Sequence, residues 1–421
     1  MKKIFITATG IVLLLLLAVY GLLQYRQYSS YQNRIHQHAA LIFKINVDHI
    51  VKKRGLGNLK SDSRGFGVPA NIFVYTVSNK SALTFFCSLP VTDTAELKTY
   101  LKKSFQINHF IVDTQGSVWG NNQNQSIKIA YNDKNVVVSY SLVKENVNDI
   151  MEELLAGKSF LADTADRIAR LKKEDAPVVY DFKNYSGQAS FADHRILLNG
   201  TFPVEDFGVT DALNRPAAVT KGLSVNAWVN GRLSRLFTKD IRFKDYVLNK
   251  DSLLKYYKGY AAIEVGNTVN QSQPVISYTY NDEFEKIEQL VQKEVKVPEI
   301  TLSLNGNTSS LVHYLQKQRV IGADNQLNKE LFPLYEVYGQ YDNRVLQFST
   351  NKARPMISAV PTTPYFLFAE LDFDQIRKQN QFPVFNSYIK KLSSLKVKAI
   401  KQNHQVGKVE IELKFNQEFS F

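Results

Sequence analysis

An uncharged apolar run near the amino terminus constrains this chain more than any other feature. The run extends over Ile4–Leu23 and directly follows Lys2 and Lys3. Twenty helical residues rise about 30 Å, which matches the hydrocarbon core of a bilayer. We therefore expect one transmembrane anchor at 4–23, preceded by a short cytoplasmic tip at 1–3.

The residues at the end of the run distinguish between kinds of membrane segment. A lipoprotein signal needs a cysteine just after the run, but the only cysteine in the chain is Cys87. A cleavable signal peptide normally has a shorter apolar core and small residues at its exit, whereas this run continues with bulky residues to Tyr25. A retained signal-anchor is therefore favoured, and cleavage stays an alternative.

The charges that flank the run predict its orientation. Lys2 and Lys3 lie on the amino-terminal side, whereas only Arg26 is close on the other side. The positive-inside rule then places the amino terminus in the cytoplasm. We expect a single-pass protein of a bacterial inner membrane, with residues 24–38 as a juxtamembrane stalk and the body in the periplasm.

The composition of the chain is that of a folded, basic protein. Hydrophobic residues make up 44% and aromatic residues 12% of the sequence, which is far from a disordered composition. The 52 lysines and arginines exceed the 39 acidic residues, and the net charge is +13. This charge favours anionic neighbours such as lipid headgroups or acidic envelope polymers. Export argues against a nucleic-acid partner.

The order of apolar strands and capped helices predicts an α+β body of antiparallel sheets with helices packed on one side. We place a first domain at 39–157, a helical connector at 158–175 and a second body at 176–421, which is long enough for two substructures. Segments 39–53 and 365–378 both show a strand, then Asn or Asp, then a helix, when Asp48 is aligned with Asp374. A duplicated unit is therefore one possibility.

Several individual elements have clear local signals. Asp93 and Glu96 resemble a capping box at the start of a helix. Segments 126–131 and 135–140 flank an Asn-Asp turn and predict a hairpin. Strict alternation predicts a strand at 408–415. The spacing of apolar residues after Asp282 favours a helix with Phe284, Ile287, Leu290 and Val291 facing inward.

The search for catalytic, metal or cofactor motifs finds no convincing site. Ser-x-x-Lys occurs at Ser252, Ser387 and Ser393, but no Lys-Thr-Gly accompanies it, as penicillin-recognising enzymes require. The close pair His36 and His38 falls short of the three or four ligands of a zinc site. Helix capping accounts for Asp372 and Asp374. We therefore expect no enzyme, no catalytic residue, no bound metal and no cofactor.

A family resemblance rests on the first third of the body. There, ALIFKINVDHIVKK is followed by a glycine-rich loop and by NIFVYTVSNKSALTFFCSLPVTDTAELKTYL. The sequence resembles exported, membrane-anchored proteins of unknown function of the Bacteroidota type. Many of those proteins carry a lipoprotein cysteine that this chain lacks. The resemblance implies export and a strand-rich carboxy-terminal part, but it assigns no functional residues.

Three functional hypotheses follow. The first is a non-catalytic, membrane-anchored periplasmic protein that scaffolds envelope components through a protein partner. The second is a protein that binds lipid or an anionic polymer, such as a glycan, and the third is an envelope hydrolase with an unrecognised site. Under the second hypothesis, the candidate contacts with anions are Lys52, Lys53, Arg54, Lys60, Arg64, Lys396, Lys398 and Lys401.

Overall fold

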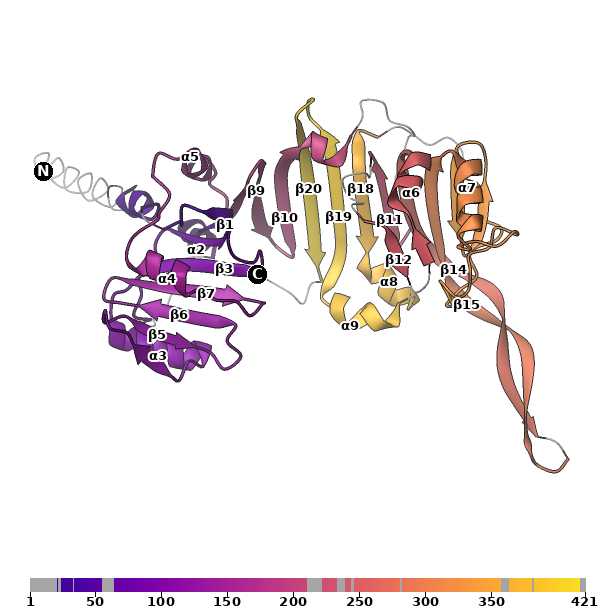
Figure 1. Cartoon of the computed structure of the whole chain (residues 1–421), viewed down its shortest axis with the longest axis horizontal. Coiled ribbons are helices and arrows are strands. Elements are labelled where there is room, and N and C mark those ends of the chain that lie inside the picture. The colour runs from indigo at the N-terminus through magenta and orange to yellow at the C-terminus, as the bar shows by residue number, and fades with distance from the viewer. Residues whose placement is uncertain are drawn as a thin grey trace, which may run out of the picture. The chain divides into compact units, whose positions relative to one another are not determined.

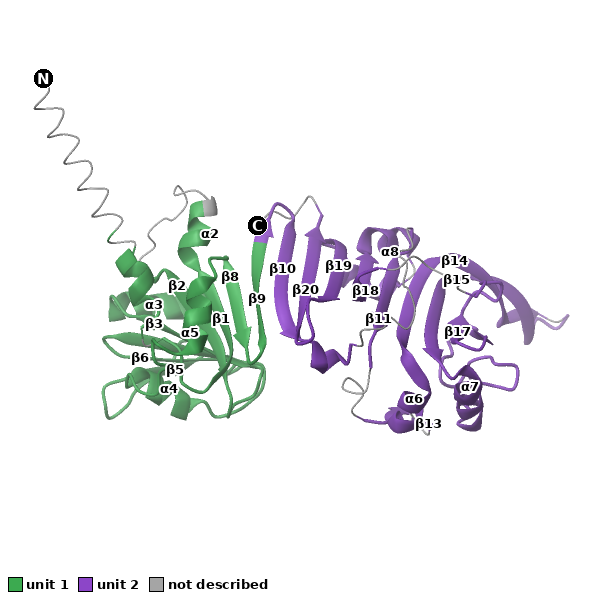
Figure 2. Cartoon of the chain, turned by 90° about the horizontal axis from the view of Figure 1, so that it is seen from above, with its two compact units in different colours: residues 1–190 green, residues 191–421 purple. Residues whose placement is uncertain are grey.

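The chain forms two compact units. The computed structural model describes residues 21, 24–32, 34–54, 64–209, 222–232, 239–243, 246–280, 282–356, 363–380 and 382–416. Unit 1 extends to Ser190 and unit 2 begins at Phe191 (Figure 2). The division therefore lies after the segment 158–175, in which we expected a connector. The helix in that segment packs inside unit 1, where Ile168 and Leu171 join the core.

Unit 1 is built on an antiparallel sheet with the order β4-β5-β6-β7-β3-β2-β1-β8-β9. Its strands are β1 (Ala39–Asn46), β2 (Asn71–Val77), β3 (Thr84–Pro90), β4 (Phe110–Val112), β5 (Val118–Asn121), β6 (Ile127–Tyr131), β7 (Asn135–Ser141), β8 (Val178–Phe182) and β9 (Tyr185–Ala192). Its helices are α2 (Val47–Arg54), α3 (Thr94–Phe105), α4 (Asn148–Leu155) and α5 (Asp166–Lys173).

Helices cover both faces of the unit 1 sheet. Val136 and Val137 are adjacent in β7 and therefore point to opposite faces. Val136 packs with Leu97 and Leu101 of α3, whereas Val137 packs with residues of α4 and α5, including Met151. The expectation that helices lie on one side of the sheets is therefore wrong for this unit.

The polar segment 24–38 contributes to the core of unit 1. Residues 24–29 are helical. Tyr31, Ile35 and His36 are buried, and Tyr31 and Ile35 belong to the main hydrophobic cluster. Residues 30–32 and 34–36 are thus part of the folded unit, in place of the stalk that we expected.

The strands of unit 2 are also antiparallel, in the order β10-β20-β19-β18-β11-β14-β15-β17-β16, and Figure 1 shows most of them. Its strands are β10 (Arg195–Pro203), β11 (Val225–Asn230), β14 (Tyr257–Tyr280), β15 (Lys286–Gly306), β16 (Tyr338–Tyr341), β17 (Val345–Ser349), β18 (Tyr365–Asp372), β19 (Leu392–Lys401) and β20 (Val406–Phe415). A small hairpin of β12 (Ile241–Phe243) and β13 (Tyr246–Leu248) stands apart from this sheet. The helices are η2 (Val204–Phe207), α6 (Lys250–Tyr256), α7 (Thr308–Lys317), α8 (Phe373–Gln379), η4 (Pro383–Phe385) and α9 (Asn386–Ile389).

A long β-ribbon projects from unit 2. β14 and β15 pair from Tyr257–Gly306 to Tyr280–Lys286, but β11 flanks β14 only at 260–265 and β17 flanks β15 only at 301–305. Beyond these contacts the two strands continue as a ribbon, which is plain in Figure 1. We call residues 270–280 and 282–296 the arm. The predicted helix after Asp282 is therefore wrong, because these residues form the second strand of the arm.

The predicted fold class needs correction as a whole. The described residues are mostly antiparallel strand, and their helices are short and lie on both faces of the unit 1 sheet. Among these residues no helix is both long and apolar enough to cross a membrane. The transmembrane helix on which the predicted fold class and the signal-anchor description rested is thus not found among the described residues, and both descriptions are corrected to a mostly antiparallel strand body. The predicted span at 4–23 itself lies outside the described residues, apart from Gly21.

Candidate functional site: an apolar pocket in unit 2

The candidate site is a pocket between the unit 2 sheet and the helices α6 and α7. The two helices form a hydrophobic cluster with β15, β17 and the segment 320–337. The cluster leaves a cavity of about 550 Å³, which falls in the range of roughly 300–1,000 Å³ that small-molecule sites occupy. The residues that line it are Lys239, Ile241, Leu248, Lys250, Leu253, Leu254, Tyr257, Ala261, Ile300, Leu302, Leu304, Leu311, Leu315, Val320, Leu327, Phe332, Val337, Phe348 and Thr350.

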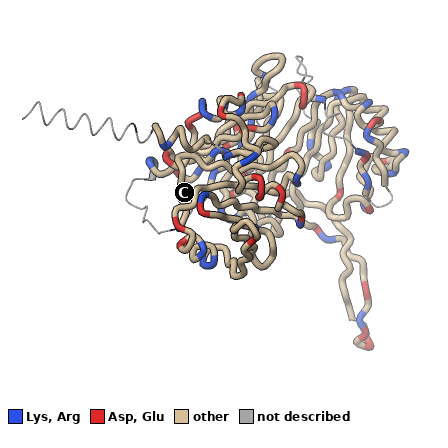
Figure 3. The backbone as a smooth tube through the Cα atoms, turned by 60° about the vertical axis from the view of Figure 1, so that its left-hand side comes forward, with Lys and Arg blue, Asp and Glu red and all other residues tan. Residues whose placement is uncertain are grey.

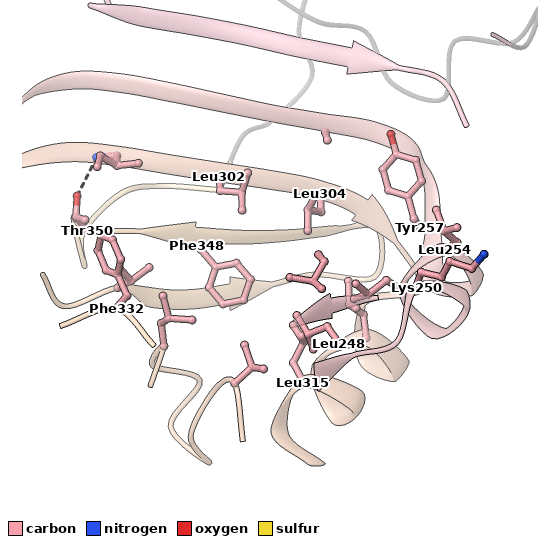
Figure 4. A pocket seen from close by; sticks show the side chains of 18 of the residues that line it. Leu248, Lys250, Leu254, Tyr257, Leu302, Leu304, Leu315, Phe332, Phe348 and Thr350 are labelled. Carbon is pink, nitrogen blue, oxygen red and sulfur yellow. Dashed lines mark hydrogen bonds between the residues drawn. The ribbon is translucent and has the colours of Figure 1, made fainter. Parts of the chain in front are cut away.

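Strand alternation and helix periodicity together produce the apolar lining. Ile300, Leu302 and Leu304 recur every second residue of β15 and therefore point to one face. Leu311 and Leu315 are four residues apart on α7, so they lie on one side of that helix. Figure 4 shows Leu302, Leu304 and Phe348 pointing from the strands toward Leu248 and Leu315.

Few polar groups face the pocket. The Thr350 hydroxyl is already engaged, because it donates to the Pro298 carbonyl at 2.7 Å and accepts from the Ile300 amide at 2.9 Å. The Tyr257 hydroxyl is buried and has no hydrogen-bond partner among the described residues. Burial raises the pKa of this phenol, so it stays protonated. The interior can therefore exclude water and accept an apolar chain, but it offers no nucleophile or base.

Two lysines supply the positive charge of the lining. The amine of Lys250 points away from the apolar side chains (Figure 4). Among the described residues, this amine forms a loose ion pair of 3.9 Å with Asp251, a residue that is itself 79% exposed. Lys239 is exposed. The nearby Asp240 is bound by the Lys250 amide at 3.0 Å and by the Asn249 side chain at 3.3 Å. An apolar interior with ammonium groups at its margin suits an amphiphile with an anionic head.

The structure places the predicted anion contacts in two separate groups. Lys52 and Arg64 belong to unit 1, where both are exposed, and Lys60 and the side chains of Lys53 and Arg54 lie outside the described residues. In unit 2, Lys396 pairs with Glu370 at 2.9 Å and Lys398 pairs with Glu410 at 3.4 Å. Their charges are thus offset by neighbouring strands. Lys401 ends β19, and the role of all eight residues stays a prediction.

The residues of the rejected catalytic motifs make structural interactions. Asp372 caps α8 by accepting from the Gln375 amide at 2.8 Å. Asp374 pairs with Arg377 and accepts from the Ser393 hydroxyl at 2.6 Å, so the serine of one Ser-x-x-Lys match is bound to a carboxylate. Lys396 of the same match pairs with a glutamate.

The histidine pair that is too small for a zinc site belongs to unit 1. The buried ring of His36 contacts Glu153 at 3.0 Å through Nε2 and accepts from the His38 amide at 3.1 Å through Nδ1. Both ring nitrogens of His36 are thus in use. Within the described ranges, no group of three or more His, Cys, Asp or Glu residues is arranged to hold a metal ion.

Comparisons with known proteins add little to this description. No protein-family model and no curated protein matches the sequence. Crystal forms III, I and IV of the protein TP0453 align with 10% identity and with TM-scores of 0.24, 0.23 and 0.22. Forms III and I cover 75% of this chain and 90% of their own. At such scores the likeness carries no argument, and the family resemblance stays a prediction.

Proposed function

We propose that unit 2 binds a single-chain amphiphile with an anionic head, such as a fatty acid. The observation that carries this proposal is the apolar cavity of about 550 Å³ with lysines in its margin. Each methylene group transferred from water to such an interior contributes about 0.8 kcal/mol, so a long acyl chain supplies most of the affinity. The head group would then lie near Lys239 and Lys250.

The pocket lacks the parts that acyl-chain chemistry would need. Among the described residues, its lining contains no Ser, Cys, His or carboxylate. Thr350 is held by two backbone hydrogen bonds, and the Tyr257 phenol is protonated. This supports a binding role over a hydrolytic one. Of the earlier hypotheses, the lipid-binding alternative is thus the one that a specific observation favours.

The proposal can be tested by photo-crosslinking in the full-length chain. A palmitate analogue with a diazirine in its tail should label peptides of α6, β15 and α7. Leu302→Trp should reduce this labelling, because Leu302 lines the cavity and points into it. Leu334→Trp is the matched control, since Leu334 is 62% exposed and does not line the cavity.

Two results would contradict the proposal. Labelling scattered over both units, with no dependence on Leu302, would show that the probe merely coats apolar surface. If palmitate and its uncharged alcohol compete equally well with the probe, Lys239 and Lys250 do not bind the head group. Hydrogen exchange of the Leu302→Trp variant should match that of the wild type outside the pocket, which separates loss of binding from loss of folding.

A further inference from the structure

The arm exposes an unusual amount of apolar surface for a two-stranded ribbon. Ile276 is 53% exposed and Leu290 is 74% exposed, and the register pairs these two residues across the strands. Tyr278 and Tyr280 lie on the same face and are 48% and 69% exposed. At the turn, Phe284 is 87% exposed. A lone two-stranded ribbon is marginal in water, and apolar patches of this kind mark interaction sites.

The charges of the arm are distributed unevenly along its length. The turn carries Asp282, Glu283 and Glu285, whereas Lys293 and Lys296 lie nearer the body. Figure 3 shows acidic positions at the free end with a basic position beside them, an acidic position further along, and a basic position toward the base. Insertion of the turn into a bilayer would desolvate these carboxylates along with Phe284, which is costly. The surface therefore fits a protein partner better than a lipid core.

One face of the arm, which carries Ile276 and Leu290, has charges that complement those of a second arm running in the opposite direction. Counting from Leu290, Lys286 lies four residues toward the turn and Glu294 lies four residues toward the base. Both belong to the face of Ile276 and Leu290, because alternate residues share a face. A two-fold axis at the Ile276–Leu290 pair would thus place Lys286 of one arm opposite Glu294 of the other, twice.

We propose that two copies of this chain associate through their arms, packed face to face and antiparallel about the Ile276–Leu290 pair. In this arrangement the apolar residues at the centre cover one another, and each acidic turn lies over the other copy's Lys296. Parallel packing would instead bring the two acidic turns together and is disfavoured. Such a two-fold contact is isologous, so it closes after two copies. The inference does not depend on a ligand in the pocket.

The arrangement can be tested with single cysteines in the full-length chain, after Cys87→Ala removes the native thiol. Facing sheets pack about 10 Å apart, so a short bismaleimide should join two copies of Leu290→Cys. Lys286→Cys should not join to itself, because its two copies would lie about 27 Å apart at 3.4 Å per residue. Lys286→Cys and Glu294→Cys should join when coexpressed. Ile111→Cys on β4, at 72% exposure, reports random collision.

Charge exchange provides a second, independent test. Lys286→Glu should lower the yield of the Leu290→Cys crosslink at least about fivefold, since it turns two attractive pairs into repulsive ones. Adding Glu294→Lys should restore the yield. A Leu290→Cys yield no higher than that of Ile111→Cys would overturn the proposal, as would self-crosslinking of Lys286→Cys. If vesicles, and not a second copy of the chain, protect the Leu290→Cys thiol from the crosslinker, the arm binds a bilayer and the proposal is wrong.

Discussion

Arg167 on α5 and Asp181 on β8 form a buried ion pair, with Nε of the arginine 2.6 Å from Oδ1 of the carboxylate. The Asp181 side chain is only 2% exposed, and the same guanidinium also donates to the backbone carbonyls of Ala39, Ala40 and Asp181. One side chain therefore ties α5 to two strands. Arg170 completes the site with a contact of 2.9 Å to Oδ2, but it is 48% exposed.

We expect Arg167→Met to destabilise unit 1 far more than Arg170→Met. Loss of Arg167 leaves Oδ1 of a buried carboxylate and several carbonyls without their donor, with only the exposed Arg170 still paired to Asp181, which should cost about 3 kcal/mol. Loss of the exposed Arg170 should cost about 1 kcal/mol or less. Denaturant unfolding followed by Trp119 fluorescence, in a Trp228→Phe background, reports on unit 1 alone. Equal losses for the two variants would contradict this assignment.

The buried amine of Lys44 predicts a specific pH dependence of stability. Lys44 is 1% exposed and donates to the Leu171 carbonyl at 2.6 Å and to the Glu174 carbonyl. Burial lowers its pKa from 10.5 to about 8, although Asp175 and Glu174 oppose the shift. Between pH 8 and 10.5 the unfolded chain therefore binds the proton that the folded chain has released.

The free energy of unfolding should accordingly rise between pH 8 and 10.5, because over this range the unfolded chain still holds the Lys44 proton that the folded chain has released. The rise should amount to about 2–3 kcal/mol, and Lys44→Met should lack it. The difference between the two proteins isolates this group from Cys87, whose pKa is raised to about 12 by burial and which acts in the opposite direction above pH 9. Curves of the two proteins that stay parallel from pH 7.5 to 10 would refute the assignment.

The backbone of Gly65 lies so close to the start of α3 that no side chain fits between them. Its φ is +70°, and a Cβ would lie 2.1 Å from the Leu97 nitrogen and 2.3 Å from the Asp93 oxygen. Gly116 also has a positive φ of +84°, but nothing lies within 4 Å of its Cβ position. Gly116→Ala should therefore cost about 1 kcal/mol of backbone strain alone.

Gly65→Ala should cost about 3 kcal/mol or more, because the backbone of α3 must move. Thr92 and Asp93 both donate to the Gly65 carbonyl, so this movement should expose the helix start. Hydrogen exchange of peptides from 92–101 should accelerate in Gly65→Ala and not in Gly116→Ala. Equal exchange in both variants would mean that the loop, and not the helix, absorbs the substitution.

Elements with local signals were predictable from the sequence. Asp93 accepts from the Ala95 and Glu96 amides at 2.8 and 2.9 Å, as an N-cap should, and β6 and β7 form the expected hairpin. The helix expected after Asp282 is wrong although Phe284, Ile287 and Leu290 have helical spacing. That spacing presumes a core to face, whereas Phe284 lies in the turn of the arm at 87% exposure, and pairing with β14 holds Ile287 and Leu290 in a ribbon at 47% and 74% exposure.

The pocket could not be predicted, because its lining is assembled from distant segments. Leu248, Leu302, Leu315 and Phe348 come from four elements that only the tertiary fold brings together. Each of them has the pattern of an ordinary core residue. The signal that distinguishes a pocket from a core is unfilled volume, which a sequence does not contain. The two lysines at its margin, Lys239 and Lys250, are likewise not among the eight basic residues that the sequence pattern indicated as contacts with anions.

The lysines of the pocket margin should select the head group of the ligand. Lys239→Gln and Lys250→Gln keep a polar side chain but remove its charge. Each should weaken competition by palmitate about twofold to fivefold, since exposed ion pairs contribute roughly 0.2–1 kcal/mol. Competition by the uncharged alcohol should not change. Lys52→Gln on unit 1 is the control for general surface charge, and an equal effect there would remove the margin lysines from the site.

The length of the acyl chain should set the affinity of the pocket. While the tail still enters apolar space, each added methylene contributes about 0.8 kcal/mol, or about a fourfold decrease in the dissociation constant. The gain should end when the tail fills the cavity of about 550 Å³. Competition by laurate, myristate, palmitate and stearate against the photoreactive probe measures this dependence. Leu302→Trp should move the end of the gain to a shorter chain, because the indole occupies part of the same volume. Affinity that keeps rising with length in both proteins would instead indicate adsorption to an open surface.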